Sequence, residues 1–343
     1  MSGLQDEFFS HINNPTEISD SVISSTASNT VVQKENNTNT SSRVGNRVFN
    51  AVCLSSGSVR GIFQLGALYA ADFSGALNQV KYYAGTSVGA IISMLMAVGW
   101  HPIDIFTYIC VNDFTKLLPN NLDIVNTFSK WGAVDPQPLK EFIKKMVLQK
   151  YGGCPTFKQL AKEGKIFVCP AYRLRHTHSN VYFSPETTPD MSVVDAVMLS
   201  SNIPFVFQSQ THQDDYYIDG AVFDHNPASF LSSYITKHHD ETPSILNVSV
   251  HVRQEEQVTD TSNIDSQDGD DEKLAQLKQL TLMEYVKEIM MVALYSQQKV
   301  NSTDEIYRMD IHTGTTTWTS LPDKAEKIKW FCEGTEQALP HFK

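Results

Sequence analysis

Residues 82 to 100 read YYAGTSVGAIISMLMAVGW. The pentapeptide G-T-S-V-G at positions 85–89 matches the pattern G-x-S-x-G, in which a serine sits on a sharp turn from a strand into a helix. Because glycine has no Cβ, Gly85 and Gly89 allow strained backbone angles and a close approach of the helix to the strand. Ser87 is therefore either a nucleophile presented at this turn or a small residue that lets the chain change direction.

Strand-like and helix-like segments alternate around this turn. The apolar run Val48 to Leu54 predicts a strand, and the helical spacing of apolar residues from Ile62 to Phe73 predicts a helix after it. We expect further strands at 80–84, 166–172, 181–183, 216–218 and 245–252, a capped helix after Ser192, and an amphipathic helix over 282–293. This alternation predicts an α/β fold, a three-layer α/β/α sandwich with a mostly parallel central sheet.

Composition divides the chain into four parts. Residues 1–46 are rich in Ser, Thr and Asn and predict a disordered tail, and residues 47–253 carry the strand and helix pattern of the main domain. Residues 254–273 predict an acidic flexible loop, since Ile264 and Ser266 stand where an EF-hand needs calcium ligands. Residues 274–343 are expected to supply C-terminal helices and a strand that pack on the main domain.

Bulk composition disfavours several classes of protein. The net charge of −11 argues against a nucleic-acid partner, which requires a basic face. The five cysteines are odd in number and lack C-x-x-C spacing, so neither a zinc ribbon nor a disulfide framework is expected. The amino terminus has no classical secretory signal, and the longest apolar run, 89–100, is shorter than the ~20 residues that span a bilayer. We therefore expect a cytoplasmic protein.

Two further segments carry candidate chemistry. Residues 53–61, C-L-S-S-G-S-V-R-G, join the first strand to the first helix. One interpretation is that their backbone amides, at the start of the helix, point at a bound anion. The other is that the segment is an ordinary connecting turn. Downstream, Asp219 lies in Y-Y-I-D-G-A-V-F-D-H-N-P (216–227). Its carboxylate is expected at a strand end, where sites form in open α/β sheets, although Asp-Gly is also a common hairpin turn.

Together these segments resemble the patatin-like phospholipase family, the PNPLA-type lipid acyl hydrolases. That family carries G-G-G-x-R-G, then G-x-S-x-G, then D-G-G or D-G-A, in the same order as the three segments here. Residues 188–207, which contain L-S-S-N-I-P-F-V-F, resemble the family's segment ending A-x-x-A-I-P-x-x-F, and Asn226-Pro227 matches its N-P. The resemblance covers roughly residues 48–252 and implies a patatin-like fold.

The resemblance implies a role for each matching residue. Ser87 would be the nucleophile and Asp219 its base, forming a dyad without histidine. The amides of Gly57, Ser58 and Val59 would form the oxyanion hole. The supporting motif residues are Arg60, Gly61, Gly85, Gly89, Gly220 and Ala221. A dyad of this kind predicts no histidine titration near pH 6.5 in kcat/KM.

The implied activity is hydrolysis of carboxylic esters of phospholipids or acylglycerols through an acyl-serine intermediate. This chemistry requires no cofactor and no metal. The expected partner is a lipid or membrane-surface substrate, contacted peripherally, so the protein would act in the cytoplasm or at the surface of membranes or lipid droplets. The sequence leaves the head group, the acyl chain and the oligomeric state open.

Three residues depart from the family pattern. Ser56 and Ser58 replace the outer two of the family's three glycines, and His225 stands where the family usually has asparagine. One alternative is therefore a weakly active or inactive patatin-fold protein that binds lipid or another partner. Another is a Ser-Asp-His α/β-hydrolase that would use Ser87, Asp195 or Asp219, and His225 or His251.

Overall fold

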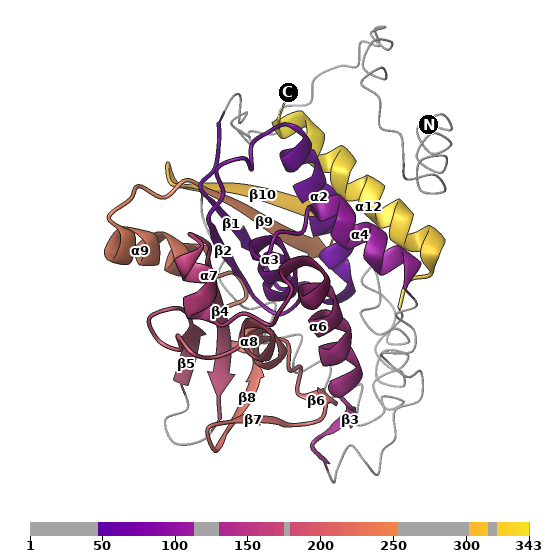
Figure 1. Cartoon of the computed structure of the whole chain (residues 1–343). Coiled ribbons are helices and arrows are strands. Elements are labelled where there is room, and N and C mark those ends of the chain that lie inside the picture. The colour runs from indigo at the N-terminus through magenta and orange to yellow at the C-terminus, as the bar shows by residue number, and fades with distance from the viewer. Residues whose placement is uncertain (1–46, 113–129, 175–178, 253–301, 315–320, 343) are drawn as a thin grey trace, which may run out of the picture. The chain divides into compact units, whose positions relative to one another are not determined.

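The computed structural model describes residues 47–112, 130–174, 179–252, 302–314 and 321–342 (Figure 1). All of them belong to one compact unit, residues 44–343. The predicted tail at 1–46, the acidic loop at 254–273 and the helix at 282–293 lie outside the described residues.

The core is an eight-stranded mixed sheet. Seven strands follow the order β10-β9-β1-β2-β4-β8-β7, and β5 pairs with β4 beside this path. The parallel strands are β1 (Ala51–Leu54), β2 (Tyr82–Gly85), β4 (Ile166–Arg173), β9 (Ile245–Val252) and β10 (Ile306–Thr313). The strands β5 (Ser179–Phe183), β7 (Gln210–His212) and β8 (Asp215–Asp219) extend the sheet with antiparallel pairings.

The centre of the sheet is covered on both faces. Every residue of β1 and β2 is buried, which explains why these strands appear in the sequence as short continuous apolar runs rather than as alternating patterns. Parallel strands end at a common edge, so the segments that follow β1 and β2 lie close together at the carboxyl ends of these strands.

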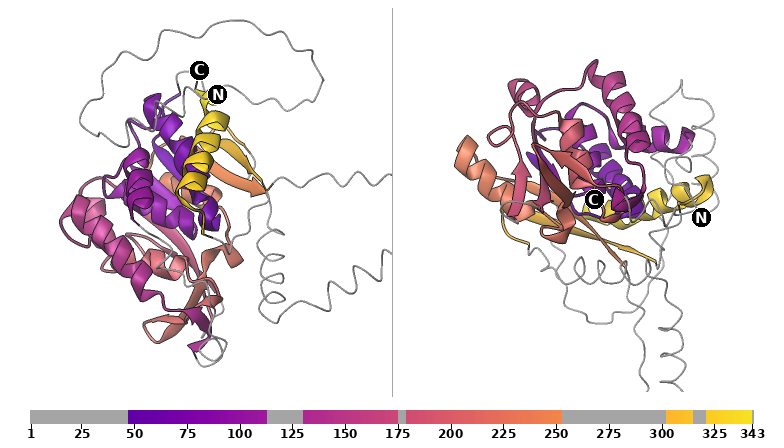
Figure 2. Two further views of the ribbon diagram at one scale, coloured as in Figure 1. Left: turned by 90° about the vertical axis from the view of Figure 1, so that its right-hand side faces the viewer. Right: turned by 90° about the horizontal axis from the view of Figure 1, so that it is seen from below.

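One face packs against α2 (Gly61–Phe73), α3 (Val88–Ala97) and the C-terminal α12 (Lys324–Ala338), and α4 (Pro102–Val111) packs on these three helices. Figure 2 shows α12 alongside α2. The two helices approach closely because a Cβ at Gly66 would lie 2.0 Å from the Phe331 carbonyl oxygen, and one at Gly334 would lie 2.1 Å from that of Phe63. Phe331 also stacks on Phe106 of α4, with ring centroids 4.0 Å apart.

The opposite face packs against α9 (Ala228–His239). Leu231, Tyr234 and Ile235 of this helix join a buried cluster with residues of β1, β2, β4, β9 and β10. The other helices of the described residues are α6 (Gln137–Tyr151), α7 (Phe157–Lys162) and α8 (Val193–Ser200), with short 3-10 turns η1 (Ser58–Arg60), η3 (Gly220–Val222) and η4 (Leu339–His341). A small separate sheet pairs β3 (Gly132–Val134) with β6 (Phe205–Phe207).

The predicted fold class, an α/β sandwich with a mostly parallel central sheet, is confirmed by this arrangement. The chain after residue 301 contributes β10 at the sheet edge and α12 on the first helical face. Ser192 caps α8 as expected, accepting a hydrogen bond from the Val194 amide at 3.2 Å, but Asp195 pairs with Lys140 at 2.7 Å instead of completing a capping box.

No helix in the described part of the chain is by itself long and apolar enough to cross a membrane. Only α3 and α4 taken together, which are bent by 118° relative to each other, reach that length and composition.

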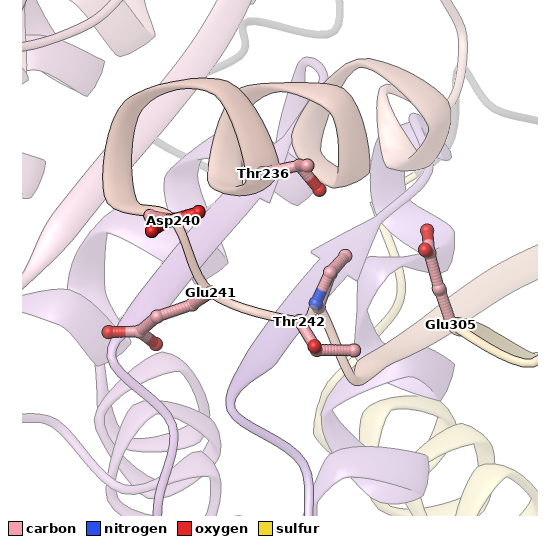
Figure 3. Close-up of a pocket in the computed structure, with 6 residues that line it drawn as sticks. Thr236, Asp240, Glu241, Thr242 and Glu305 are labelled. Carbon is pink, nitrogen blue, oxygen red and sulfur yellow. The ribbon is translucent and has the colours of Figure 1, made fainter.

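A pocket of about 190 Å³ lies at the amino ends of β9 and β10 (Figure 3). It is lined by Thr236, Asp240, Glu241, Thr242, Pro243 and Glu305. Because these residues precede β9 and β10 or end α9, the pocket lies at the edge of the sheet opposite the carboxyl ends of the parallel strands. It therefore contains none of the predicted site residues.

Candidate active site

The turn from β2 into α3 holds Ser87 in a strained backbone conformation. Its φ is 58° and its ψ is −124°, an arrangement that costs a non-glycine residue about 1–3 kcal/mol. The two flanking glycines make the turn possible. A Cβ at Gly85 would lie 2.4 Å from the backbone of Gly89, and a Cβ at Gly89 would lie 2.5 Å from the Ser55 carbonyl oxygen. The motif thus brings α3 against both neighbouring strands and places Ser87 at its amino terminus.

Asp219 ends β8 and is almost fully buried, with 4% of its surface exposed. Its amide donates to the carbonyl of Asn202 at 2.9 Å, and its Oδ1 accepts from the Ala221 amide at 2.8 Å. Burial raises the pKa of this carboxyl from 3.8 to about 6, although hydrogen bonds from the Ser87 side chain and the Ala221 amide oppose the shift. The Asp-Gly pair therefore ends a strand and does not form a hairpin turn.

The structure brings Ser87 and Asp219 together. The Ser87 side chain lies close enough to the Asp219 carboxylate to oppose the rise in its pKa, although the two residues are far apart in the sequence. The Ser87 amide also donates to Ser200 Oγ at 3.3 Å, so the end of α8 touches the turn from the side. Asn202, two residues further on, holds β8 through its side-chain amide, which donates to the Tyr217 carbonyl at 2.7 Å.

The loop formed by residues 56–60, called here the 56–60 loop, follows β1 and leads into α2. Among the described residues, the amides of Gly57, Ser58 and Val59 donate to no protein acceptor. Arg60 supports the loop from within, because its amide and its Nε both donate to the Gly57 carbonyl at 3.1 Å. Three successive unpaired N–H groups at the start of a helix are suited to binding a negatively charged oxygen.

Glycine is required at 57 and 61 for packing. A Cβ at either position would lie 2.6 Å from a valine methyl group, Val250 Cγ2 for Gly57 and Val88 Cγ2 for Gly61. Ser58, in contrast, carries a side chain at a φ of 51°, where glycine is favoured. The departure from the family pattern at 58 therefore costs backbone strain of about 1 kcal/mol or more.

The segment after Asp219, residues 220–226 (the 220–226 loop), is hydrogen-bonded to the turn that carries Ser87 and to β9. Thr86 Oγ1 donates to the Asp224 carbonyl at 2.8 Å, which fastens the loop to the serine turn. Asn226 Nδ2 donates to Ser249 Oγ on β9 at 2.7 Å. The base and the nucleophile are therefore held in one hydrogen-bonded framework.

Both histidines proposed for a Ser-Asp-His triad, and Asp195, are engaged elsewhere. Nδ1 of His225 lies 2.6 Å from Ser56 Oγ, His251 Nε2 lies 2.9 Å from Asp310 Oδ1, and Asp195 pairs with Lys140. Burial, with positive charge on His251 and Arg60, lowers the pKa of His225 to about 4. These contacts connect none of the three candidates to Ser87.

In the described residues, no three His, Cys, Asp or Glu side chains are grouped so that they could hold a metal ion. Sequence reasoning did not assign roles to Ser200 and Asn202. The quoted run L-S-S-N-I-P contained them, but only the fold shows that they contact Ser87 and the strand that carries Asp219.

Comparison with known proteins identifies the family. The sequence model of the patatin-like phospholipases matches residues 52–231, which contain Ser87, Asp219 and the 56–60 loop. The chain therefore belongs to the patatin-like phospholipase family.

Among curated proteins, it is 30% identical over 196 residues to the "Probable lipid hydrolase 463L" of Invertebrate iridescent virus 6, covering 56% of this chain and 66% of that protein. It is 24% identical over 163 residues to the "Uncharacterized protein R571" of Acanthamoeba polyphaga mimivirus, covering 47% of this chain and 53% of that protein. The chain thus spans between half and two thirds of these relatives. Among solved structures, VipD from Legionella pneumophila matches with a TM-score of 0.50 and 15% identity, covering 86% of this chain and 66% of VipD, a likeness of fold alone.

Proposed function

We propose that this chain is a serine acyl hydrolase of lipid esters that uses Ser87 and Asp219 as a catalytic dyad. The observation that carries the proposal is the proximity of the Ser87 side chain to the buried Asp219 carboxylate, the rise in whose pKa it opposes. Among the described residues, the backbone amides of Gly57, Ser58 and Val59 donate to no protein acceptor and are suited to binding the oxyanion. Membership of the patatin-like phospholipase family supports lipid as the substrate class.

In the proposed reaction, the Ser87 hydroxyl attacks the ester carbonyl while Asp219 accepts its proton. The negative charge that develops on the carbonyl oxygen is bound by amides of Gly57, Ser58 and Val59. As the tetrahedral intermediate collapses, Asp219 returns the proton to the departing alcohol, leaving an acyl group on Ser87. Water, deprotonated by Asp219, then releases the fatty acid and restores the serine.

The burial of Asp219 suits this role. An ordinary aspartate is a poor base because its pKa lies near 3.9, whereas a pKa of about 6 makes the carboxylate more basic and still leaves it largely ionised at pH 7. Removal from water also strengthens the interaction of the amides with the developing charge. We further propose that the protein acts in the cytoplasm, at the surface of lipid assemblies.

Incubation of a mixed lipid extract with purified protein, followed by mass spectrometry, tests the proposal. Ser87→Ala and Asp219→Asn should both abolish the appearance of free fatty acids, and the double variant should be no slower than either single variant, because members of one catalytic unit are not additive. Ser74→Ala and the exposed Asp104→Asn are matched controls and should retain turnover.

A fluorophosphonate probe distinguishes an enzyme from a binding protein, because only an activated serine reacts quickly with it. Wild-type protein should be labelled at Ser87. If the wild-type protein is not labelled and releases no fatty acid, the result would support a patatin-fold protein without catalytic activity. The strained backbone at Ser58 would then be the structural reason for the loss of activity.

A further inference from the structure

Two of the three residues that depart from the family pattern contact one another. Ser56 Oγ lies 2.6 Å from His225 Nδ1, and the Ser56 amide donates to the His225 carbonyl at 2.9 Å. The two residues are 169 positions apart in the sequence. This pair therefore joins the 56–60 loop to the 220–226 loop through both a backbone and a side-chain hydrogen bond.

The pair lies at one end of the three unpaired amides. Ser56 directly precedes Gly57, while Arg60 fastens the other end of the loop by donating twice to the Gly57 carbonyl. Between these anchors, Ser58 has a φ of 51°, a conformation that is unfavourable for a residue with a Cβ. A loop that contains such a residue depends on contacts outside itself to keep its shape.

We propose that Ser56 and His225 are positioning residues that hold the amides of the 56–60 loop in place to bind the oxyanion. The inference rests on the proposed function, since it concerns the same site. The Ser56 hydroxyl and Nδ1 of His225 share one hydrogen bond, in which the hydroxyl donates when the imidazole carries its proton on Nε2. At neutral pH the imidazole is uncharged, because burial and the nearby charges of His251 and Arg60 lower its pKa to about 4.

The expected kinetic signature follows from what the loop binds. The amides interact most strongly with the charge that develops in the transition state, so their displacement lowers kcat more than it changes KM. A displacement of about 1 Å at a catalytic group can cost as much as 100-fold in rate. We therefore expect loss of the pair to lower kcat by about 10- to 100-fold and to change KM by less than about threefold.

The test compares four variants of the full chain on a soluble ester. Ser56→Ala removes the hydroxyl and His225→Leu removes the ring nitrogen of this hydrogen bond, so both should show the loss of kcat. His225→Asn places a side-chain oxygen near the position of Nδ1 and should keep kcat within about threefold of wild type. Because the two residues act through one contact, Ser56→Ala with His225→Leu should be about as slow as the slower single variant.

Matched controls are Ser74→Ala and His101→Leu. His101 follows the carboxyl end of α3, whereas Ser87 lies at its amino end, and His101 Nδ1 lies 3.0 Å from Asp72 Oδ2. Its replacement should therefore leave kcat unaltered. Thermal unfolding of every variant separates a loss of fold from a loss of rate. If leucine at 225 prevents folding, Ser56→Ala with His225→Asn still decides the question.

Three results would overturn the proposal: Ser56→Ala with kcat within twofold of wild type, His225→Asn as slow as His225→Leu, or a double variant whose losses multiply. Its failure is distinct from failure of the proposed function. If only the positioning role of Ser56 and His225 is wrong, Ser87→Ala and Asp219→Asn still abolish turnover, while the Ser56 and His225 variants remain active.

Discussion

Replacing Asp219 by asparagine should make the protein more stable at neutral pH while abolishing its activity. In the folded state the carboxyl has a pKa of about 6, compared with an ordinary value of 3.8. At 1.36 kcal/mol for each pH unit, the difference corresponds to a destabilisation on the order of 3 kcal/mol when the buried carboxylate is ionised. Asparagine has no charge to bury and can still accept the Ala221 amide.

The sign follows from the raised pKa. Between pH 3.8 and 6 the folded protein binds a proton that the unfolded chain has already released, so the stability due to this group is complete at low pH and is lost as the pH rises through 6. The Asp219→Asn variant has no carboxyl at this position and therefore does not lose this stability as the pH rises. The free energy of unfolding of the variant minus that of wild type should therefore grow by about 2 kcal/mol from pH 4.5 to pH 7.5.

Urea unfolding of both proteins at pH 4.5, 6.0 and 7.5 measures this difference. Asp310→Asn is a control for which the difference in the free energy of unfolding should stay nearly constant over this pH range. Burial alone would raise the pKa of Asp310, but hydrogen bonds and charge from His251 and Arg308 outweigh it and lower the pKa. Wild type therefore gains stability from Asp310 only as the pH rises through about 3.8, so above pH 4.5 this contribution is already nearly complete. A difference for Asp219→Asn that stays constant over this pH range would show that the carboxylate is not desolvated, and the argument for its basicity would fail.

Three further outcomes are expected. The value of kcat/KM should rise with pH through about 6, as Asp219 ionises, and this limb should persist in His225→Asn; its disappearance would assign it to the histidine. Gly89→Ala should destabilise the fold by about 1–3 kcal/mol in urea unfolding because its Cβ meets backbone oxygens, whereas Gly153→Ala, which meets nothing within 4 Å, should not; equal stabilities would contradict this packing. Ester hydrolysis should continue in the presence of a chelator, since the dyad supplies both base and acid; activity lost to chelation and restored by Ca²⁺ would overturn this prediction.

The local motifs carried much of the information about the fold and the candidate site. G-x-S-x-G and D-G each encode a turn within a few residues, so Ser87 and Asp219 could be placed at strand ends from sequence alone. The contact between Ser56 and His225 could not be predicted in this way, because it depends on how β1 and the chain after β8 pack across the sheet. For the same reason, nothing local in L-S-S-N-I-P indicated that Asn202 would anchor the strand that carries Asp219.

The acidity of Asp219 also depends on tertiary structure and changes one expectation. A dyad was predicted to show no histidine titration near pH 6.5, and a limb in that range would have suggested a triad. Since burial brings the carboxyl itself to about 6, the position of the limb no longer separates the two mechanisms. What separates them is whether the limb persists in the His225→Asn variant.

The unpaired amides of Gly57, Ser58 and Val59 would also bind the carboxylate that ester hydrolysis releases. If the proposed reaction occurs, the fatty acid released from Ser87 would lie near Asp219, so the ionised Asp219 carboxylate would repel it, whereas the protonated form would not. Product inhibition should therefore be strong below pH 6 and should weaken above it. The charge that makes Asp219 costly to bury would then serve turnover a second time, by expelling the fatty acid after each cycle.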